Sequence, residues 1–168
     1  EFALLTKAKV YIIKGRFKMK DWKKDLSDIF NKIEEEKQDK EKRIKEKKSE
    51  VESFYLLKVT LAFEELKTEL EKHGRRVEVY STEEYASITV EFKGIEECSY
   101  AIKVRVSPDR AFPYREHRYT NKKDGKVYES THGFIRGGSQ GYNISDISKE
   151  EIRQDFLFLY TFWALPYD

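Results

Sequence analysis

The chain has 168 residues, 39% of them apolar and 38% charged, and its 33 basic and 31 acidic side chains give a net charge of +2. A chain of this length can bury a core of its own, so we expect one α+β domain spanning 1–168. The balanced charge gives the whole molecule a weak field, which excludes a general electrostatic argument for binding nucleic acid or membranes.

Cys98 is the only cysteine, which excludes an intramolecular disulfide and zinc sites built on cysteine pairs. No apolar run approaches the roughly 18 residues that a membrane span needs, and no segment has the core of a signal peptide. We therefore expect a cytoplasmic protein that does not associate with membranes. No cofactor-binding motif occurs, and we expect no cofactor and no metal.

Residues 8–13 crowd β-branched apolar residues among lysines and predict a short strand. Neither proline nor glycine occurs from Lys20 to His73, and Gly74 follows where a helix C-cap is expected. This predicts a long helix with two apolar stripes, both of which we expect to be buried. The first stripe comprises Trp22, Leu26, Ile29 or Phe30, and Ile33, and the second comprises Phe54, Val59, Phe63, Leu66 and Leu70.

Between the two stripes, residues 34–50 offer Ile44 as their one apolar side chain and carry many Glu and Lys pairs at helical spacing. Three structures fit this composition: a solvated helix, a weak coiled coil, or a charged turn between two antiparallel helices. We expect a solvent-exposed helical arm or a hairpin.

After Gly74 the apolar period changes from 3.6 to 2, which predicts an antiparallel meander of about five strands. Asp124-Gly125 is a typical hairpin turn, and Lys93-Gly94 also allows a tight connection. Pro108 and Pro113 predict that the strand before the Asp-Gly turn lies at an edge or begins late. Glycines in 137–141 predict a flexible loop.

Ser148 and Glu151 match a capping box that starts a C-terminal helix running to about Ala164, packed on the sheet. Leu157, Phe158 and Phe162 give this helix more apolar surface than one flank against a sheet can cover. Together with the charged arm, this surplus predicts a homodimer.

The segment 101–136 holds nine Lys or Arg against four Asp or Glu, interleaved with aromatic residues. Guanidinium and ammonium groups displace counterions from phosphates, and exposed aromatic rings stack on unpaired bases. The alternative is an edge strand protected by charge. The predicted binding residues are Lys103, Arg105, Arg110, Tyr114, Arg115, Arg118 and Arg136.

Glu91 and Lys93 share one strand face, as acid and amine do in some magnesium-dependent nucleases, and Glu78 on the preceding strand is the candidate second acid. Solvent-facing Glu and Lys are also common without any site. The three histidines, His73, His117 and His132, have no ligand spacing, and we expect them to be structural.

The sequence thus favours a non-enzymatic binding or adaptor module that self-associates and contacts a protein partner, with nucleic acid as a second partner class. The alternative is a metal-dependent nuclease or related hydrolase that uses Glu78, Glu91 and Lys93.

Overall fold

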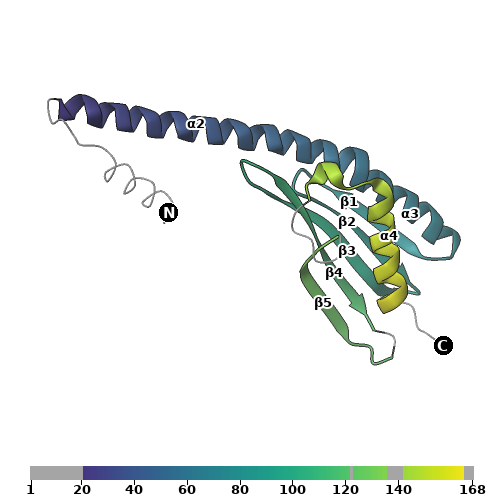
Figure 1. Cartoon of the computed structure of the whole chain (residues 1–168). Coiled ribbons are helices and arrows are strands. Elements are labelled where there is room, and N and C mark those ends of the chain that lie inside the picture. Colours follow the sequence, from purple (N-terminus) through teal and green to yellow (C-terminus); the bar gives the residue numbers. More distant parts are fainter. Residues whose placement is uncertain (1–20, 122, 136–141, 165–168) are drawn as a thin grey trace. The chain divides into compact units, whose positions relative to one another are not determined.

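The computed structural model describes residues 21–121, 123–135 and 142–164. The predicted strand at 8–13, the predicted loop at 137–141 and Arg136 lie outside these residues. The chain divides into two units, Glu1–Asp39 and Lys40–Asp168. The described elements follow the predicted order of a long helix, an antiparallel sheet and a C-terminal helix, which confirms the α+β layout (Figure 1).

The N-terminal helical run comprises α2 (Trp22–Phe54), the π-helix η1 (Tyr55–Thr60) and α3 (Leu61–Lys72). These follow one another directly, so the predicted hairpin does not occur. Side chains of residues 34–50 are exposed apart from Ile44 and Lys47, which are half-buried, as expected of a segment with a single apolar residue.

The helical run ends where the sequence predicts, because Gly74 adopts a φ of 75° that other residues rarely reach. The backbone N–H of Arg75 donates to the carbonyl of Leu70 and that of Gly74 to the carbonyl of Glu71. These bonds satisfy carbonyls that the helix end would otherwise leave without a partner.

The two predicted stripes differ in their surroundings. The second is buried with Val51 and Tyr55 in the core of the unit that begins at Lys40. The prediction that the first is also buried is wrong for the single chain, since its side chains are between 45% and 61% exposed. Periodicity identifies the apolar face of a helix but not what covers it.

Five antiparallel strands form one sheet in the order β1-β2-β3-β4-β5, so each strand pairs with its neighbours in sequence. This order confirms the predicted meander. The strands are β1 (Arg76–Ser81), β2 (Tyr85–Phe92), β3 (Ile95–Val106), β4 (Ala111–Thr120) and β5 (Val127–Gly133).

The prediction that the proline-containing strand lies at an edge or begins late is wrong. β4 begins at Ala111 and is flanked by β3 and β5. Pro113 is tolerated because it pairs with Val104 of β3 on one side, whereas β5 pairs with β4 only from Arg115 onwards. A proline has no N–H to donate, and at this point no second strand requires one.

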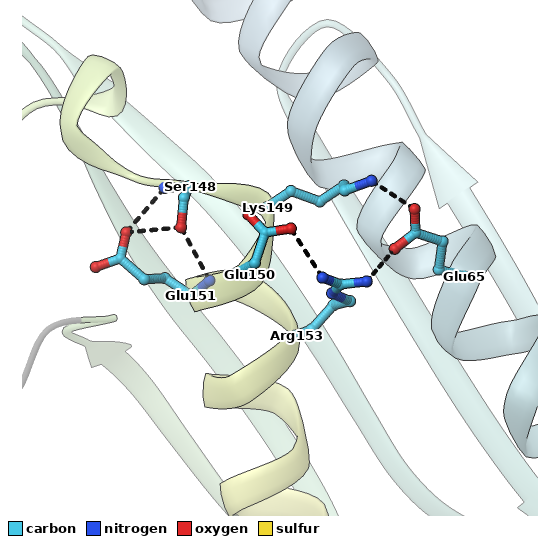
Figure 2. A network of polar contacts seen from close by, with 6 residues as sticks. All are labelled: Glu65, Ser148, Lys149, Glu150, Glu151 and Arg153. Carbon is cyan, nitrogen blue, oxygen red and sulfur yellow. Dashed lines mark hydrogen bonds and ion pairs between the residues drawn. The ribbon is translucent and has the colours of Figure 1, made fainter.

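The helix α4 (Lys149–Leu159) begins at the predicted capping box, in which Ser148 accepts from the backbone N–H of Glu151 and the Glu151 carboxylate accepts from that of Ser148. The π-helix η3 (Tyr160–Ala164) continues it. Figure 2 shows this cap beside the contact that joins the two helices: Glu65 of α3 forms ion pairs with Lys149 and Arg153 of α4.

Helices α3 and α4 cover one face of the sheet, which we call the inner face (Figure 1). The ring of Tyr100 on β3 marks their junction, since it makes edge contacts with Phe63 of α3 at 5.9 Å and with Phe156 of α4 at 5.7 Å between centroids. The core is closed by packing of this kind, with aromatic rings arranged edge to face.

Lys58 of the π-helix η1 forms hydrogen bonds to the segment that precedes α4. The Nζ of Lys58 donates to the carbonyls of Ile144, Ser145 and Ile147 at 3.3, 3.2 and 2.7 Å. The 3-10 turn Ile144–Asp146 (η2) is thereby tied to the N-terminal helical run. None of the described helices is both long enough and apolar enough to cross a membrane.

Candidate functional site

The face of the sheet opposite α3 and α4, which we call the outer face, carries no described helix (Figure 1). Its centre consists of small side chains, because Ser87 pairs with Ala101 and Thr89 with Ser99 across β2 and β3. These four residues are half-buried, while the alternate residues of β2 are fully buried beneath the helices. The sheet is therefore packed on one side only, as antiparallel sheets often are.

Tyrosines flank this small-residue centre. The rings of Tyr80 and Tyr85 lie 5.7 Å apart between centroids, and the ammonium of Lys103 lies 5.8 Å from the Tyr85 ring. The guanidinium of Arg105 on β3 lies 5.8 Å from the ring of Tyr114 on β4. Such cation–π contacts hold large rings at a surface where they keep contact area available.

A shallow hollow of about 220 Å³ opens on the outer face where the pairing of β4 with β5 shifts register. The hollow has a floor of small residues and walls of charged and hydroxyl side chains. Its volume is below the range of roughly 300 to 1,000 Å³ found for small-molecule sites. Residues that line it include Ser99, Ala101, Glu116, Arg118, Glu129 and Thr131.

The predicted basic patch is neutralised on this face by neighbouring carboxylates. Lys103 forms an ion pair of 2.6 Å with Glu116, and Arg118 makes two bonds of 2.8 Å to the carboxylate of Glu96. Glu129 lies 3.9 Å from the same arginine. The hydrogen bonds that they donate to Glu116 and Glu96 raise the pKa of Lys103 and of Arg118, so both side chains remain charged while paired.

The other predicted binding residues do not form one surface. Arg110 lies near the β3–β4 turn, 5.8 Å from the ring of Phe112, and Tyr114 and Arg105 share the outer face as described above. Arg115 belongs to the inner face, where its guanidinium donates to the Asp155 carboxylate and to the carbonyl of Phe134. The structure thus separates Arg115 from Arg118.

Arg115 is part of a buried polar cluster that sequence reasoning missed. Tyr100 donates to Asp155 at 2.7 Å, and Asp155 also holds Arg115. Burial raises the pKa of the Asp155 carboxyl, although the bonds from Tyr100 and Arg115 oppose this shift. Burial, and then the charge of Arg115, lower the pKa of the adjacent His117. This cluster holds α4 on the sheet.

The predicted acidic pair does come together, but around an arginine. Arg76 pairs with Glu78 and lies 3.4 Å from Glu91, so one guanidinium engages both carboxylates. Lys93 lies at the β2–β3 turn with its ammonium 5.2 Å from the ring of Phe92. Among the described residues, no group of three or more potential ligands could hold a metal ion.

Two further titratable groups are buried. Glu97, which is 1% exposed, accepts from the hydroxyl of Tyr160 and from Arg75. Cys98 is buried, and burial raises the pKa of its thiol, which makes it an inert core residue and not a nucleophile.

No family model, no curated protein and no solved structure matches this chain. The function must therefore be argued from the chemistry of the outer face itself. The signals that sequence reasoning overlooked there are Tyr80 and Tyr85 at the ends of their strands and the small residues at alternate positions of β2 and β3. Alternation could have identified these small residues as a face without a core.

Proposed function

We propose that this chain is a non-enzymatic binding module that holds a protein partner on the outer face of its sheet and self-associates through α2. The observation that carries the proposal is the character of that face: it is uncovered by described helices, lined with small hydroxyl residues and flanked by tyrosines. Tyrosine and arginine are enriched in protein interfaces because they combine apolar area with hydrogen-bonding groups.

The charges of the outer face favour a polypeptide over a nucleic acid. Binding to phosphates depends on cations that release counterions, whereas Lys103 and Arg118 are already paired with carboxylates. A protein partner can match a surface that carries both signs, with its own pairs replacing those at the rim. The hollow beside Ala101 has a size suited to a single side chain of such a partner.

The test is a pull-down from lysate with a matched pair of variants. Ala101→Arg fills the centre of the outer face, and Gln154→Arg adds the same side chain at an exposed position of α4. We expect a protein that is retained by the original chain and by Q154R, and lost with A101R. Retention of the same protein by A101R would contradict the proposal, provided that circular dichroism shows both variants folded.

A mobility-shift assay with the original chain tests whether nucleic acid is the partner. We expect no salt-sensitive mobility shift with single-stranded or duplex DNA or RNA at about 50 mM salt. A shift that is lost in Arg118→Ala would instead support the nucleic-acid class. The hydrolase prediction is tested by incubating the chain with DNA and RNA in the presence of Mg²⁺ or Mn²⁺, with Glu91→Gln as the control.

A further inference from the structure

The first stripe of α2 leaves its apolar side chains exposed in the single chain. Trp22, Leu26, Ile29 and Ile33 are 59%, 45%, 49% and 49% exposed, and Phe30 beside them is 61% exposed. Four large apolar side chains in a row on one helix face are unfavourable in water, because burying their apolar surface would lower the free energy. A stripe of this kind marks an interaction surface.

The spacing of the stripe selects the kind of surface that covers it. Its four residues follow one another at intervals of four, three and four residues, which is the alternation of the two core positions in a coiled coil. A second helix fits this seam, with each side chain entering a hole between four residues of the facing helix. The flanks carry both signs, including Lys23, Asp25 and Lys32, which disfavours an anionic lipid surface.

The charges beside the seam distinguish the two possible directions of a self-paired helix. In an antiparallel pair Trp22 faces Ile33 of the second copy and Leu26 faces its Ile29, so all four core positions are matched. The same register places Asp25 opposite Lys32 of the second copy, and the symmetry makes this contact twice. In a parallel pair Lys32 would face Lys37 of the second copy, which repels.

We propose that two copies of this chain associate through antiparallel pairing of their α2 segments over residues 22–33, with Asp25 and Lys32 forming the ion pairs at the rim. This inference rests on the self-association in the proposed function and adds its surface and direction. The seam is only about two heptads long, so the association is weak and reversible, and it depends strongly on protein concentration.

Direction is tested by cysteine cross-linking between differently sized copies, one tagged and one untagged. The chain has only the buried Cys98 of its own. In the antiparallel register a mixture of Trp22→Cys and Ile33→Cys chains gives a disulfide-linked heterodimer, while neither variant alone does, because equal positions lie eleven residues apart along the helix. If each variant forms a disulfide-linked homodimer and the mixture gives no heterodimer, the antiparallel direction is overturned.

The contact itself is tested by sedimentation equilibrium with two matched charge reversals. Asp25→Lys places like charges at both rim contacts and should weaken the dimer roughly tenfold. Asp28→Lys makes the same change three residues along, away from the seam, and should alter the dissociation constant by less than about twofold. Asp25→Lys combined with Lys32→Asp restores the opposite charges and should restore the dimer.

The failures of the two proposals are distinguishable. If the chain is monomeric at every concentration up to about 200 µM, both this interface and self-association are overturned. The same holds if the stripe is covered by another part of the same chain, or if it binds only to lipid vesicles. A dimer that is equally insensitive to D25K and D28K overturns this interface and leaves self-association standing. Binding of a partner to the outer face is measured separately and does not depend on either result.

Discussion

Arg115 and Arg118 lie three residues apart on β4, and this odd spacing sends them to opposite faces of the sheet. Arg115 pairs with Asp155 beneath α4, where their side chains are 17% and 10% exposed. Arg118 pairs with Glu96 on the outer face, where the side chains are 46% and 31% exposed. The same type of ion pair is therefore buried on one face and exposed to solvent on the other, which gives the two pairs different weight in the stability of the fold.

The largest effect on stability is expected at the buried pair of Arg115 and Asp155. Arg115→Ala leaves the buried Asp155 carboxylate without its positive partner, so we expect the free energy of unfolding to fall by about 3 to 5 kcal/mol. Urea denaturation followed by circular dichroism measures this loss.

A double replacement separates the value of the pair from the cost of breaking it. Arg115→Met with Asp155→Leu removes both charges and should lose clearly less stability than the two single replacements added together. Additive losses would show that the two side chains do not act as a pair.

The next largest effect on stability is expected at Gly133, which lies against the side chain of Arg115. A Cβ at Gly133 would lie 2.9 Å from Cγ and Nε of Arg115, and the guanidinium is held at its far end by Asp155. We expect Gly133→Ala to destabilise the fold by about 1 to 3 kcal/mol, as overpacking does. In an Arg115→Ala background the same replacement should cost almost nothing, and an equal cost in both backgrounds would refute this account of Gly133.

A smaller effect is the pH dependence that the buried face imposes. The pKa of His117 is lowered in the folded state, so below about pH 6.5 the unfolded chain takes up a proton before the folded chain does. The stability that His117 contributes above that pH is lost as the pH falls through its folded pKa.

Asp155 changes stability with pH in the opposite direction to His117. The contribution of His117 is therefore isolated by comparing the pH dependence of unfolding in the original chain with that in His117→Gln. The raised pKa of Asp155 gives a contribution that is present at low pH and lost as the pH rises through the folded pKa. The difference between the two denaturation series cancels Asp155 and retains His117. Parallel curves from pH 5 to 8 would show that His117 does not titrate differently on folding.

The smallest effect is expected on the outer face. Arg118→Ala removes an exposed pair with Glu96 and should change the free energy of unfolding by less than about 1 kcal/mol, with a still smaller change in high salt. A loss comparable to that of Arg115→Ala would show that the outer face is part of the core and would remove the basis for a partner surface there.

The sheet was predictable because its signals are local. Alternation after Gly74, the turns at Gly94 and Gly125 with φ of 78° and 66°, and the capping box at Ser148 each depend on residues close together in sequence. The side of Arg115 was not predicted, since residues 111–114 are all apolar or aromatic and give no alternation before it. Its partner was not predicted either, because Asp155 is 40 residues away on a helix whose placement no local pattern gives.

Two features of the helical run had no signal in the sequence. Residues 55–60 continue the apolar pattern of the second stripe, and nothing in them marks the change to a π-helix. The first stripe has the same helical period as the second, yet its side chains are exposed and those of the second are buried. Apolar period alone does not distinguish an apolar face that is buried within the chain from one that is exposed.

The hydrogen bonds from Lys58 to the carbonyls of Ile144, Ser145 and Ile147 affect the order of folding. The bonded atoms are 86 to 89 residues apart in sequence, so the contact closes a long loop and carries a large entropic cost before it forms. During synthesis the helix and the strands emerge well before the segment that satisfies this ammonium. Until residues 144–160 leave the ribosome, the β3 and β4 side of the nascent sheet exposes apolar surface that α4 later covers, and that interval is when the chain is most prone to aggregate.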